Sequence, residues 1–158
     1  MGGRSDVEQM NHSWQVRAAT QKDTAGLAQC MESAYSIYQD RMKGERLPPM
    51  DIDYAAEIAN YPTWVVESDE GDILGGLIMV FEDGQASIAN IAVDPRSQGQ
   101  GIGGALMKLA EEQARSRGFS EIHLATHSLL QENVSLYLHL GWKESGRQGV
   151  RILMKKEI

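Results

Sequence analysis

Apolar and polar residues alternate at the start of the chain and then change to a helical spacing. The alternation over residues 14–19 predicts a strand. The next apolar residues recur every three or four positions, which predicts a helix entered through a polar capping segment at 20–23. Its apolar positions are Leu27, Cys30, Met31, Ala34 and Tyr38. A second, shorter helix is predicted over 51–59, and Pro62 marks the break that follows it.

The rest of the chain predicts a sheet interrupted by two helices. Three successive strands are predicted over 63–67, 73–81 and 86–93, with turns between them over 68–72 and 82–84. The later elements are a helix over 103–117 with Gly118 as its C-cap, a strand over 121–126, a helix over 132–140 ended by Gly141, and strands over 142–145 and 150–155. This order predicts a mixed α/β fold with one parallel crossover, from 86–93 to 121–126. We expect a single domain over 13–158, preceded by a flexible lead-in at 1–12.

Composition and charge fit a soluble enzyme or binding domain. The 158 residues carry a net charge of −7, which argues against nucleic acid or an anionic membrane as the main partner. Cys30 is the only cysteine, so neither an internal disulfide nor a cysteine-rich zinc site can form, and we expect no metal. No apolar run reaches the length of a membrane span, and residues 1–10 lack the apolar region of a signal peptide. We therefore expect a cytoplasmic protein, and the oligomeric state, a homodimer included, stays open.

A glycine-rich segment follows the strand predicted over 86–93 and runs directly into the helix predicted over 103–117. It contains Gly99, Gly101, Gly103 and Gly104. Such a loop can point several backbone N–H groups at one anion, and the positive end of the helix dipole adds to the attraction. The segment therefore predicts a ligand that carries a phosphate or pyrophosphate.

Other interpretations of this loop fit less well. The spacing Gly99-x-Gly101-x-x-Gly104 matches a dinucleotide-binding fingerprint. However, five residues separate the strand from Gly99, where that fold has a tight turn, and Glu121 opens its strand instead of ending one. Only one parallel crossover is predicted, and the Gly-Lys-Ser/Thr of a P-loop is absent from the sequence. A nucleotide-binding oxidoreductase domain and a purely structural loop remain as alternatives.

Two motifs together resemble those of the GNAT superfamily of N-acetyltransferases. Gln98-x-x-Gly101-x-Gly103, preceded by Ile-Ala-Val-Asp-Pro at 91–95, resembles the family's acetyl-CoA-binding motif. The segment 132–142 is similar to the family's Asn…Leu-Tyr…Leu-Gly-Phe pattern, with Trp142 in place of Phe. The resemblance covers residues 14–156. It implies a GNAT-like α/β fold, in which helices flank a mixed central sheet and a splayed pair of parallel strands binds CoA.

The same resemblance implies an activity. Acetyl-CoA would be the cosubstrate, and its acetyl group would pass directly to a primary amine on a small molecule or a peptide N-terminus. A non-catalytic module of the same fold that only binds acyl-CoA is the alternative.

The resemblance also implies residue roles. Backbone amides would hold the pyrophosphate at Gln98, Gly99, Gln100, Gly101, Ile102 and Gly103. Backbone groups of Ile91 and Val93 would face the pantetheine arm, and Ile91 would help to polarise the thioester carbonyl. Tyr137 matches the family's general acid, and its alternative is a core aromatic residue. Asn133 matches an Asn that contacts the pantetheine or orders the site, and its alternative is a helix cap.

The group that removes the amine proton is less evident. At pH 7 a neutral α-amine costs about 1.4 kcal/mol and a neutral lysine-like amine about 4.6 kcal/mol, so only the latter needs a strong base. Several family members carry Glu where this chain has Ser87, so we expect no direct carboxylate base at that position. The remaining choices are Asp40, Glu82, Asp83, His127 and a chain of water molecules. We prefer water, with His127 as the side chain whose type titrates nearest neutrality.

In the family the first two helices and the loop between them usually form the acceptor wall. The residues here with suitable side chains are Tyr35, Tyr38, Arg41, Met42, Met50 and Tyr54. Aromatic residues and methionines at helical spacing can instead belong to the core, and Arg41 can bind a substrate carboxylate or lie in solvent. His127 is a further acceptor-site candidate. Cys30 is expected to be a small buried residue, because direct transfer needs no cysteine.

Overall fold

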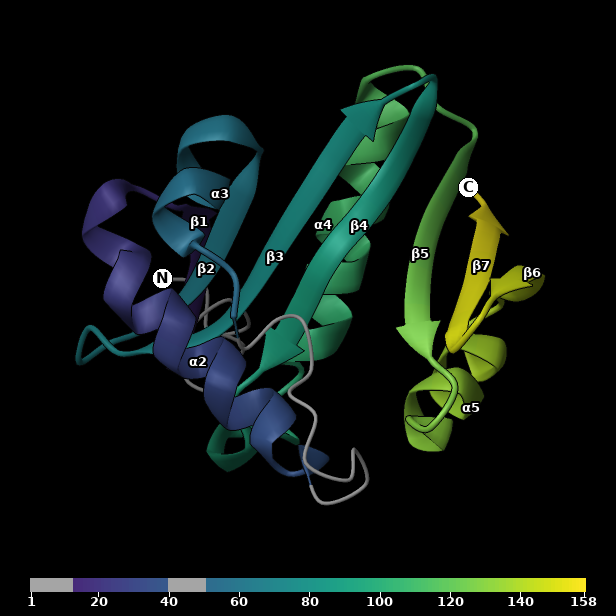
Figure 1. Ribbon diagram of the computed structural model, residues 1–158. Coiled ribbons are helices and arrows are strands. Elements are labelled where there is room, and N and C mark those ends of the chain that lie inside the picture. Colours follow the sequence, from purple (N-terminus) through teal and green to yellow (C-terminus); the bar gives the residue numbers. More distant parts are fainter. Residues whose placement is uncertain (1–12, 40–50) are drawn as a thin grey trace, which may run out of the picture.

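Seven strands form one mixed sheet at the centre of the structure (Figure 1). This computed structural model describes residues 13–39 and 51–158. The strands are β1 Trp14–Ala18, β2 Thr63–Ser68, β3 Ile73–Glu82, β4 Gln85–Val93, β5 Glu121–His127, β6 Lys143–Gln148 and β7 Arg151–Glu157. They lie in the order β1-β2-β3-β4-β5-β7-β6. The helices are α2 Thr24–Ser36, α3 Tyr54–Asn60, α4 Ile102–Ser116 and α5 Gln131–His139, with short 3₁₀ turns η1 Gln21–Asp23 and η4 Pro95–Ser97.

The predicted element order and its parallel connection through α4 are confirmed. The second helix starts later than the predicted 51–59, because the carboxylate of Asp53 accepts a hydrogen bond from the Ala56 N–H at 3.2 Å and caps it. Within the two described ranges, no helix combines the length and apolarity that crossing a bilayer requires.

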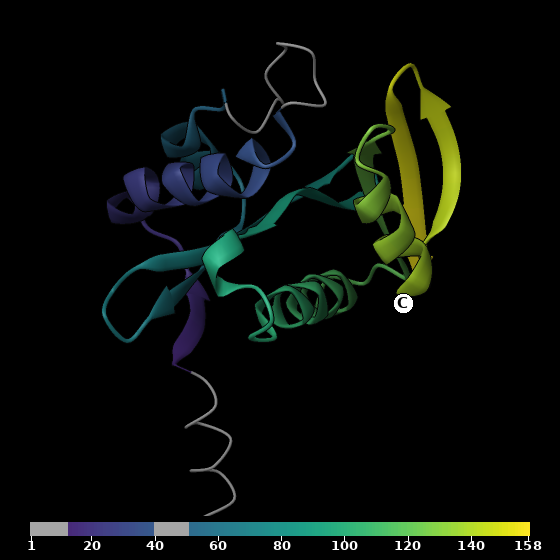
Figure 2. The ribbon, with the colours of Figure 1, turned by 90° about the horizontal axis from the view of Figure 1, so that it is seen from below.

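Helices cover both faces of the sheet. α2 packs on one face over β3 and β4, beside α3, and α4 packs on the opposite face over β3, β4 and β5 (Figure 2). On the first face the core contains Leu27, Met31, Tyr54, Val65, Ile78 and Ala92. On the second face its largest buried residues are Leu77, Met79, Leu106, Ile122, Trp142 and Met154. Alternate residues of β3 thus serve the two cores.

Adjacent glycines in β3 let both helices approach the sheet closely. A Cβ at Gly76 would collide with Cδ1 of Leu27 from α2, and a Cβ at Gly75 would lie 3.0 Å from Cγ2 of Ile102 in α4. Because successive strand residues face opposite sides, Gly76 leaves space for α2 on one face and Gly75 leaves space for α4 on the other.

β4 contains the irregularity that opens the sheet. It pairs with β3 along nearly its whole length, but Ala89 is an extra residue where the register shifts between Ile78 and Met79. The bulge changes which positions of β4 face α4. Before it the even-numbered residue Ile88 contacts the α4 core, and after it the odd-numbered residue Ile91 does. A bulge bends a strand and increases its twist, so β4 turns away from its next neighbour at this point.

That neighbour is β5, which runs parallel to β4. Only two residue pairs join them among the described residues, Ala86–Ile122 and Ser87–His123, at the amino-terminal ends of both strands. Beyond these pairs the strands diverge toward their carboxyl ends (Figure 1). The predicted splayed parallel pair is therefore confirmed.

Candidate active site

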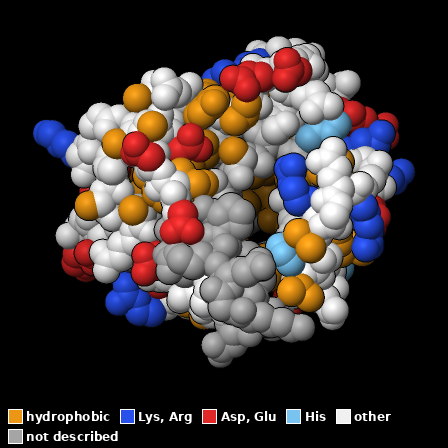
Figure 3. Space-filling view, in the orientation of Figure 1, with side chains coloured by type: hydrophobic (Ala, Val, Ile, Leu, Met, Phe, Trp, Pro, Cys, Tyr) orange, Lys and Arg blue, Asp and Glu red, His pale blue; other side chains and the backbone are white. Residues whose placement is uncertain are grey.

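A cavity of about 750 Å³ occupies the gap between β4 and β5. In Figure 3 it is seen from the α2 side as a hollow between the two halves of the molecule. Adjacent residues of each strand line it, including Ser87 with Ile88 and His123 with Leu124, so it extends from one face of the sheet to the other. Lining side chains from outside the two strands include Tyr35, Ile52, Leu130, Asn133, Tyr137, Arg151, Leu153 and Lys155.

The glycine-rich loop connects the carboxyl end of β4 to α4, next to this gap but outside the cavity lining. Gly99 and Gly101 have left-handed φ angles of 86° and 83°, and Gly101 is the N-cap of α4. From residue 99 to 104, no backbone N–H donates to a main-chain carbonyl of the described residues. These N–H groups and the positive end of the α4 dipole together suit an anion.

Gly101 and Gly103, the two glycines of the motif, differ in backbone conformation. Gly101 needs its left-handed φ, whereas Gly103 has no such angle. A Cβ at Gly103 would meet only Cγ2 of Val93, at 3.7 Å, which is ordinary contact. The surrounding structure therefore leaves room for a Cβ at Gly103.

Asp94 fixes the start of the loop. Its side chain is buried, accepts a hydrogen bond from the Arg96 N–H at 2.9 Å and pairs with the Arg96 guanidinium at 3.0 Å. Its own N–H donates to the Leu74 carbonyl of β3 at 2.8 Å. The guanidinium of Arg96 lowers the pKa of the Asp94 carboxyl below its usual range, so Asp94 stays ionised near neutrality.

α5 brings the predicted acid to the cavity. Tyr137 is half-buried with its ring edge-on to Trp142, at 5.9 Å between centroids. Burial raises the pKa of Tyr137 to about 12, with a smaller contribution from Tyr38, so its hydroxyl remains a proton donor over the working pH range. Asn133 also lines the cavity. The alternative that it caps the helix is wrong, because the N-cap of α5 is Leu130.

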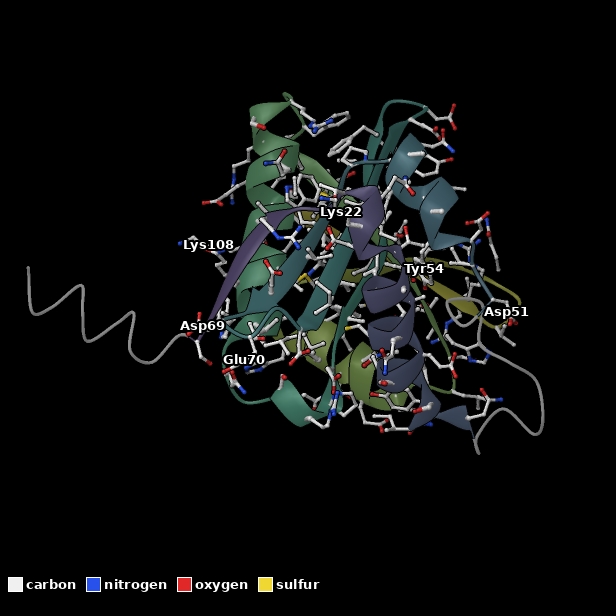
Figure 4. All side chains as sticks on the ribbon, turned by 90° about the vertical axis from the view of Figure 1, so that its left-hand side faces the viewer. Lys22, Asp51, Tyr54, Asp69, Glu70 and Lys108 are labelled. Atoms are coloured by element: carbon white, nitrogen blue, oxygen red, sulfur yellow. The ribbon has the colours of Figure 1, made fainter. Side chains whose placement is uncertain are left out.

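The predicted acceptor-wall residues fall in different places. The Tyr35 hydroxyl donates to the Ile91 carbonyl of β4 at 3.3 Å and lines the cavity. Burial is the main cause that raises the pKa of Tyr35, and the neighbouring tyrosines, Tyr38 among them, add to it. Tyr54 is only 4% exposed and packs in the core beside α2 (Figure 4), so its alternative as a core residue holds. Asp40, Arg41, Met42 and Met50 lie outside the described residues.

Two histidines of β5 line the cavity. Nε2 of His123 lies 3.1 Å from Oε1 of Glu121, so the two form an ion pair when the ring is protonated. Nδ1 of His127 instead accepts from the Leu129 N–H at 3.0 Å, so the neutral ring has its proton on Nε2 and acts as a donor. His127 was the preferred side-chain base, but its acceptor nitrogen is already engaged.

The other candidates for proton removal are placed differently. Ser87 lines the cavity and pairs with His123 across the parallel strands. Glu82 and Asp83 lie in the exposed β3–β4 hairpin, away from the cavity lining. Sequence reasoning missed His123, and it missed Arg151 and Lys155 on β7. His123 and His127 lie four residues apart on one strand and so share a face, which was a usable signal. Which residues of β7 adjoin them follows only from the pairing of β5 with β7.

Comparisons with known proteins agree with this fold. The family model for the acetyltransferase (GNAT) family matches residues 31–142. The N-acetyltransferase YjgM of Escherichia coli K12 is 29% identical over 138 residues, which are 81% of each chain. Human N-acetyltransferase 8B is 32% identical over 89 residues, and the match spans 53% of this chain and 39% of the human protein.

Solved structures share the fold at low identity. PaiA N-acetyltransferase from Thermoplasma acidophilum, in a structure with coenzyme A, matches with a TM-score of 0.80 at 17% identity, over 92% of this chain and 99% of that one. The ribosomal-protein-S18-alanine N-acetyltransferase of Escherichia coli matches with a TM-score of 0.72 at 19% identity, over 92% and 94% of the two chains.

A mixed sheet in which two parallel strands splay apart, next to a glycine-rich loop suited to a phosphate, is the fold of an acyltransferase. This chain belongs to the acetyltransferase (GNAT) family, as its motifs predicted, and is an acyltransferase.

Proposed function

We propose that the protein transfers the acetyl group of acetyl-CoA directly to a primary amine. The observation that carries the proposal is the splayed β4–β5 gap, which presents Tyr137 and Asn133 beside a loop whose N–H groups at 99–104 have no acceptor in the described main chain. The structure of the PaiA relative with coenzyme A and the N-acetyltransferase name of the YjgM relative support it.

The residues present fit a CoA thioester. The N–H groups of residues 99–103 would hold the pyrophosphate, because they have no acceptor in the described main chain and lie at a helix N-terminus, whereas the Gln98 N–H already donates to the Pro95 carbonyl at 3.5 Å. Past the two β4–β5 pairs, main-chain groups of β4 near Ile91 and Val93 have no β5 partner. The Ile91 carbonyl accepts from the Tyr35 hydroxyl, so the other main-chain groups would serve the amides of a pantetheine arm and the Ile91 N–H would donate to the thioester oxygen.

The reaction exchanges one bond for another. The amine nitrogen attacks the carbonyl carbon, the N–C bond forms, and the C–S bond breaks to release CoA thiolate. One proton must leave the nitrogen, and one must reach the thiolate from solvent or from a protein group. We assign the first to the His123 ring, directly or through water, because the ring lines the cavity and Glu121 lies 3.1 Å from its Nε2, where it stabilises the imidazolium that forms.

Tyr137 is assigned to the leaving thiolate. Full transfer from a tyrosine of pKa about 12 to a thiolate whose thiol has a pKa of about 8.5 is uphill by about 5 kcal/mol. Tyr137 therefore stabilises the thiolate by a hydrogen bond that strengthens as charge develops, and solvent supplies the proton afterwards.

Direct transfer is favoured over a cysteine-linked intermediate. Cys30 is the only cysteine in the sequence and is 2% exposed in the core. Burial raises its pKa to about 12, so it is present as an unreactive thiol.

The test is release of free thiol from acetyl-CoA over a panel of amines, with binding of CoA followed by calorimetry. We expect CoA to bind and to raise the melting temperature, and at least one amine to release thiol and yield the N-acetyl product. Binding without turnover of any amine would favour the non-catalytic module, and binding of NAD(P) in place of CoA would favour the oxidoreductase alternative.

A further inference from the structure

Pairing between β5 and β7 builds one wall of the cavity. The register joins His123 to Lys155, Ala125 to Leu153, and His127 to Arg151, and paired residues of antiparallel strands share a face. All six line the cavity. The alternating residues of the same strands, such as Leu124 and Ile152, belong to the core under α4.

This wall therefore faces away from α4 and from the loop at its N-terminus. Viewed from the α2 side, Figure 3 shows Lys, Arg and His side chains gathered over the β5–β7–β6 half of the molecule. Among the described residues that line the cavity there is no Asp or Glu. The wall is thus cationic in a protein whose net charge is −7.

The two ends of the wall differ in how their charges are compensated. At one end Glu121 contacts both His123, at 3.1 Å, and Lys155, at 3.6 Å. At the other end the Arg151 guanidinium donates to the neutral side-chain oxygen of Gln148, at 3.3 Å. Within the described residues no carboxylate pairs with Arg151, so the uncompensated charge of the wall lies there.

His127 adds a second donor beside Arg151. Its Nδ1 accepts from the Leu129 N–H, which leaves Nε2–H available. Side chains that pair directly across antiparallel strands have Cβ atoms about 5 Å apart. A permanently charged guanidinium and an imidazole N–H at that spacing complement an oxyanion with two acceptor oxygens.

We propose that the acceptor is a small amine that also carries an acidic group, a carboxylate or a phosphate, and that Arg151 and His127 bind this group. The proposal rests on the proposed function, because it takes the cavity to be the acceptor site. It separates the two anions of the reaction: the pyrophosphate of CoA lies on the α4 side of the sheet and the acidic group of the acceptor on the α2 side.

The experiment compares matched acceptors in the thiol-release assay: free amino acids against their carboxamides, and O-phosphoethanolamine against ethanolamine. We expect the acidic member of at least one pair to have a kcat/KM at least about tenfold higher. Arg151→Gln should remove that preference through KM and leave the calorimetric affinity for CoA unchanged. The carboxamide and phosphate arms show which acidic group is preferred.

Lys143→Gln is the matched control. Lys143 pairs with Lys155 and so lies on the same face, but it is exposed and does not line the cavity. Lys143→Gln removes one positive charge, as Arg151→Gln does, and should leave the preference for acidic acceptors intact. A specific contact, and not the overall charge, sets that preference.

Three results would overturn the inference. They are equal use of acidic and neutral acceptors by the wild type, an equal loss of preference in Lys143→Gln, and weaker CoA binding in Arg151→Gln, which would place Arg151 on the cofactor. Calorimetry of the acidic amines with the CoA-saturated protein keeps the two proposals apart. If an acidic amine binds in a way that depends on Arg151 but no thiol is released, the subsite is supported and the transferase proposal is contradicted. If acidic amines do not bind and are not preferred over neutral ones, only the subsite is contradicted.

Discussion

The two sides of the cavity offer different kinds of chemical groups to a ligand. On the β4 side the available groups belong to the main chain: the unpaired edge beyond the bulge at Ala89 and the N–H groups of the loop at 99–104. On the β5 side they are side chains, His123, His127 and Arg151, set in place by strand register. The first side suits an invariant cosubstrate, and the second can change its specificity by single substitutions.

This difference decides how each side can be tested. A backbone N–H cannot be deleted by ordinary substitution, so the β4 side must be blocked sterically. The β5 side can be altered one functional group at a time.

The largest effect is expected for Gly103→Val. The side chain is tolerated by the protein but would occupy the space of the pyrophosphate, so CoA binding should be lost while the fold is kept. Calorimetry and thermal unfolding measure the two properties. Gly104→Val is the matched control in the same helical turn, where a Cβ meets nothing within 4 Å. Near wild-type affinity in Gly103→Val would remove the loop from the cofactor site.

Tyr137→Phe should lower kcat about 10²-fold with CoA affinity unchanged. Because the raised pKa of Tyr137, about 12, keeps its hydroxyl protonated, wild type and variant should have pH profiles of the same shape with no alkaline limb between pH 7 and 10. Tyr61→Phe, the same change outside the cavity lining, is the control. An unchanged kcat where chemistry limits the rate would make Tyr137 a packing residue.

His123→Gln should lower kcat/KM by about tenfold to 10²-fold. A base acts on the acceptor amine and not on the cofactor, so the calorimetric affinity for CoA should stay unchanged. Ser87→Ala is the comparison at the paired position, and we expect less than a tenfold effect there. If kcat falls in His127→Ala and not in His123→Gln, the assignment of the two histidines is reversed.

The smallest effect is expected at the loop anchor. Asp94→Ala removes the acceptor of the Arg96 N–H and should cost about 1 kcal/mol of stability, with CoA affinity reduced a few-fold. The pKa of Asp94 is lowered in the folded protein, so its contribution is complete above its ordinary pKa and is lost as the pH falls through the folded value. Chemical denaturation from pH 7 to pH 3 should therefore show the stability difference shrinking, and a constant difference would contradict the ion-pair account.

The main-chain side of the site is the part that could be predicted from the sequence. Glycines at 99 and 101 mark backbone angles that other residues rarely adopt, and the motif places them at the start of a helix. Tyr137 and Asn133, which belong to one motif on one short helix, both line the cavity, and their roles stay predictions.

The side-chain wall could not be predicted in the same way. A shift of one residue in the pairing of β5 with β7 would change which residues His123 and His127 adjoin, and local patterning does not fix that register. The extra residue at Ala89 was also missed, because a bulge leaves no mark in a short apolar strand such as 85–93. Tyr54 has the spacing of a wall residue, but tertiary packing places it in the core.

The most direct test of the account is a crystal structure of the protein with CoA. The account predicts the pyrophosphate oxygens on the N–H groups of residues 99–103 and the pantetheine arm between β4 and β5, against the main chain of Ile91 and Val93. The sulfur should lie within hydrogen-bonding reach of the Tyr137 hydroxyl, and Arg151 should make no contact with the cofactor. A pyrophosphate on Arg151 and His127, or a sulfur remote from Tyr137, would contradict it.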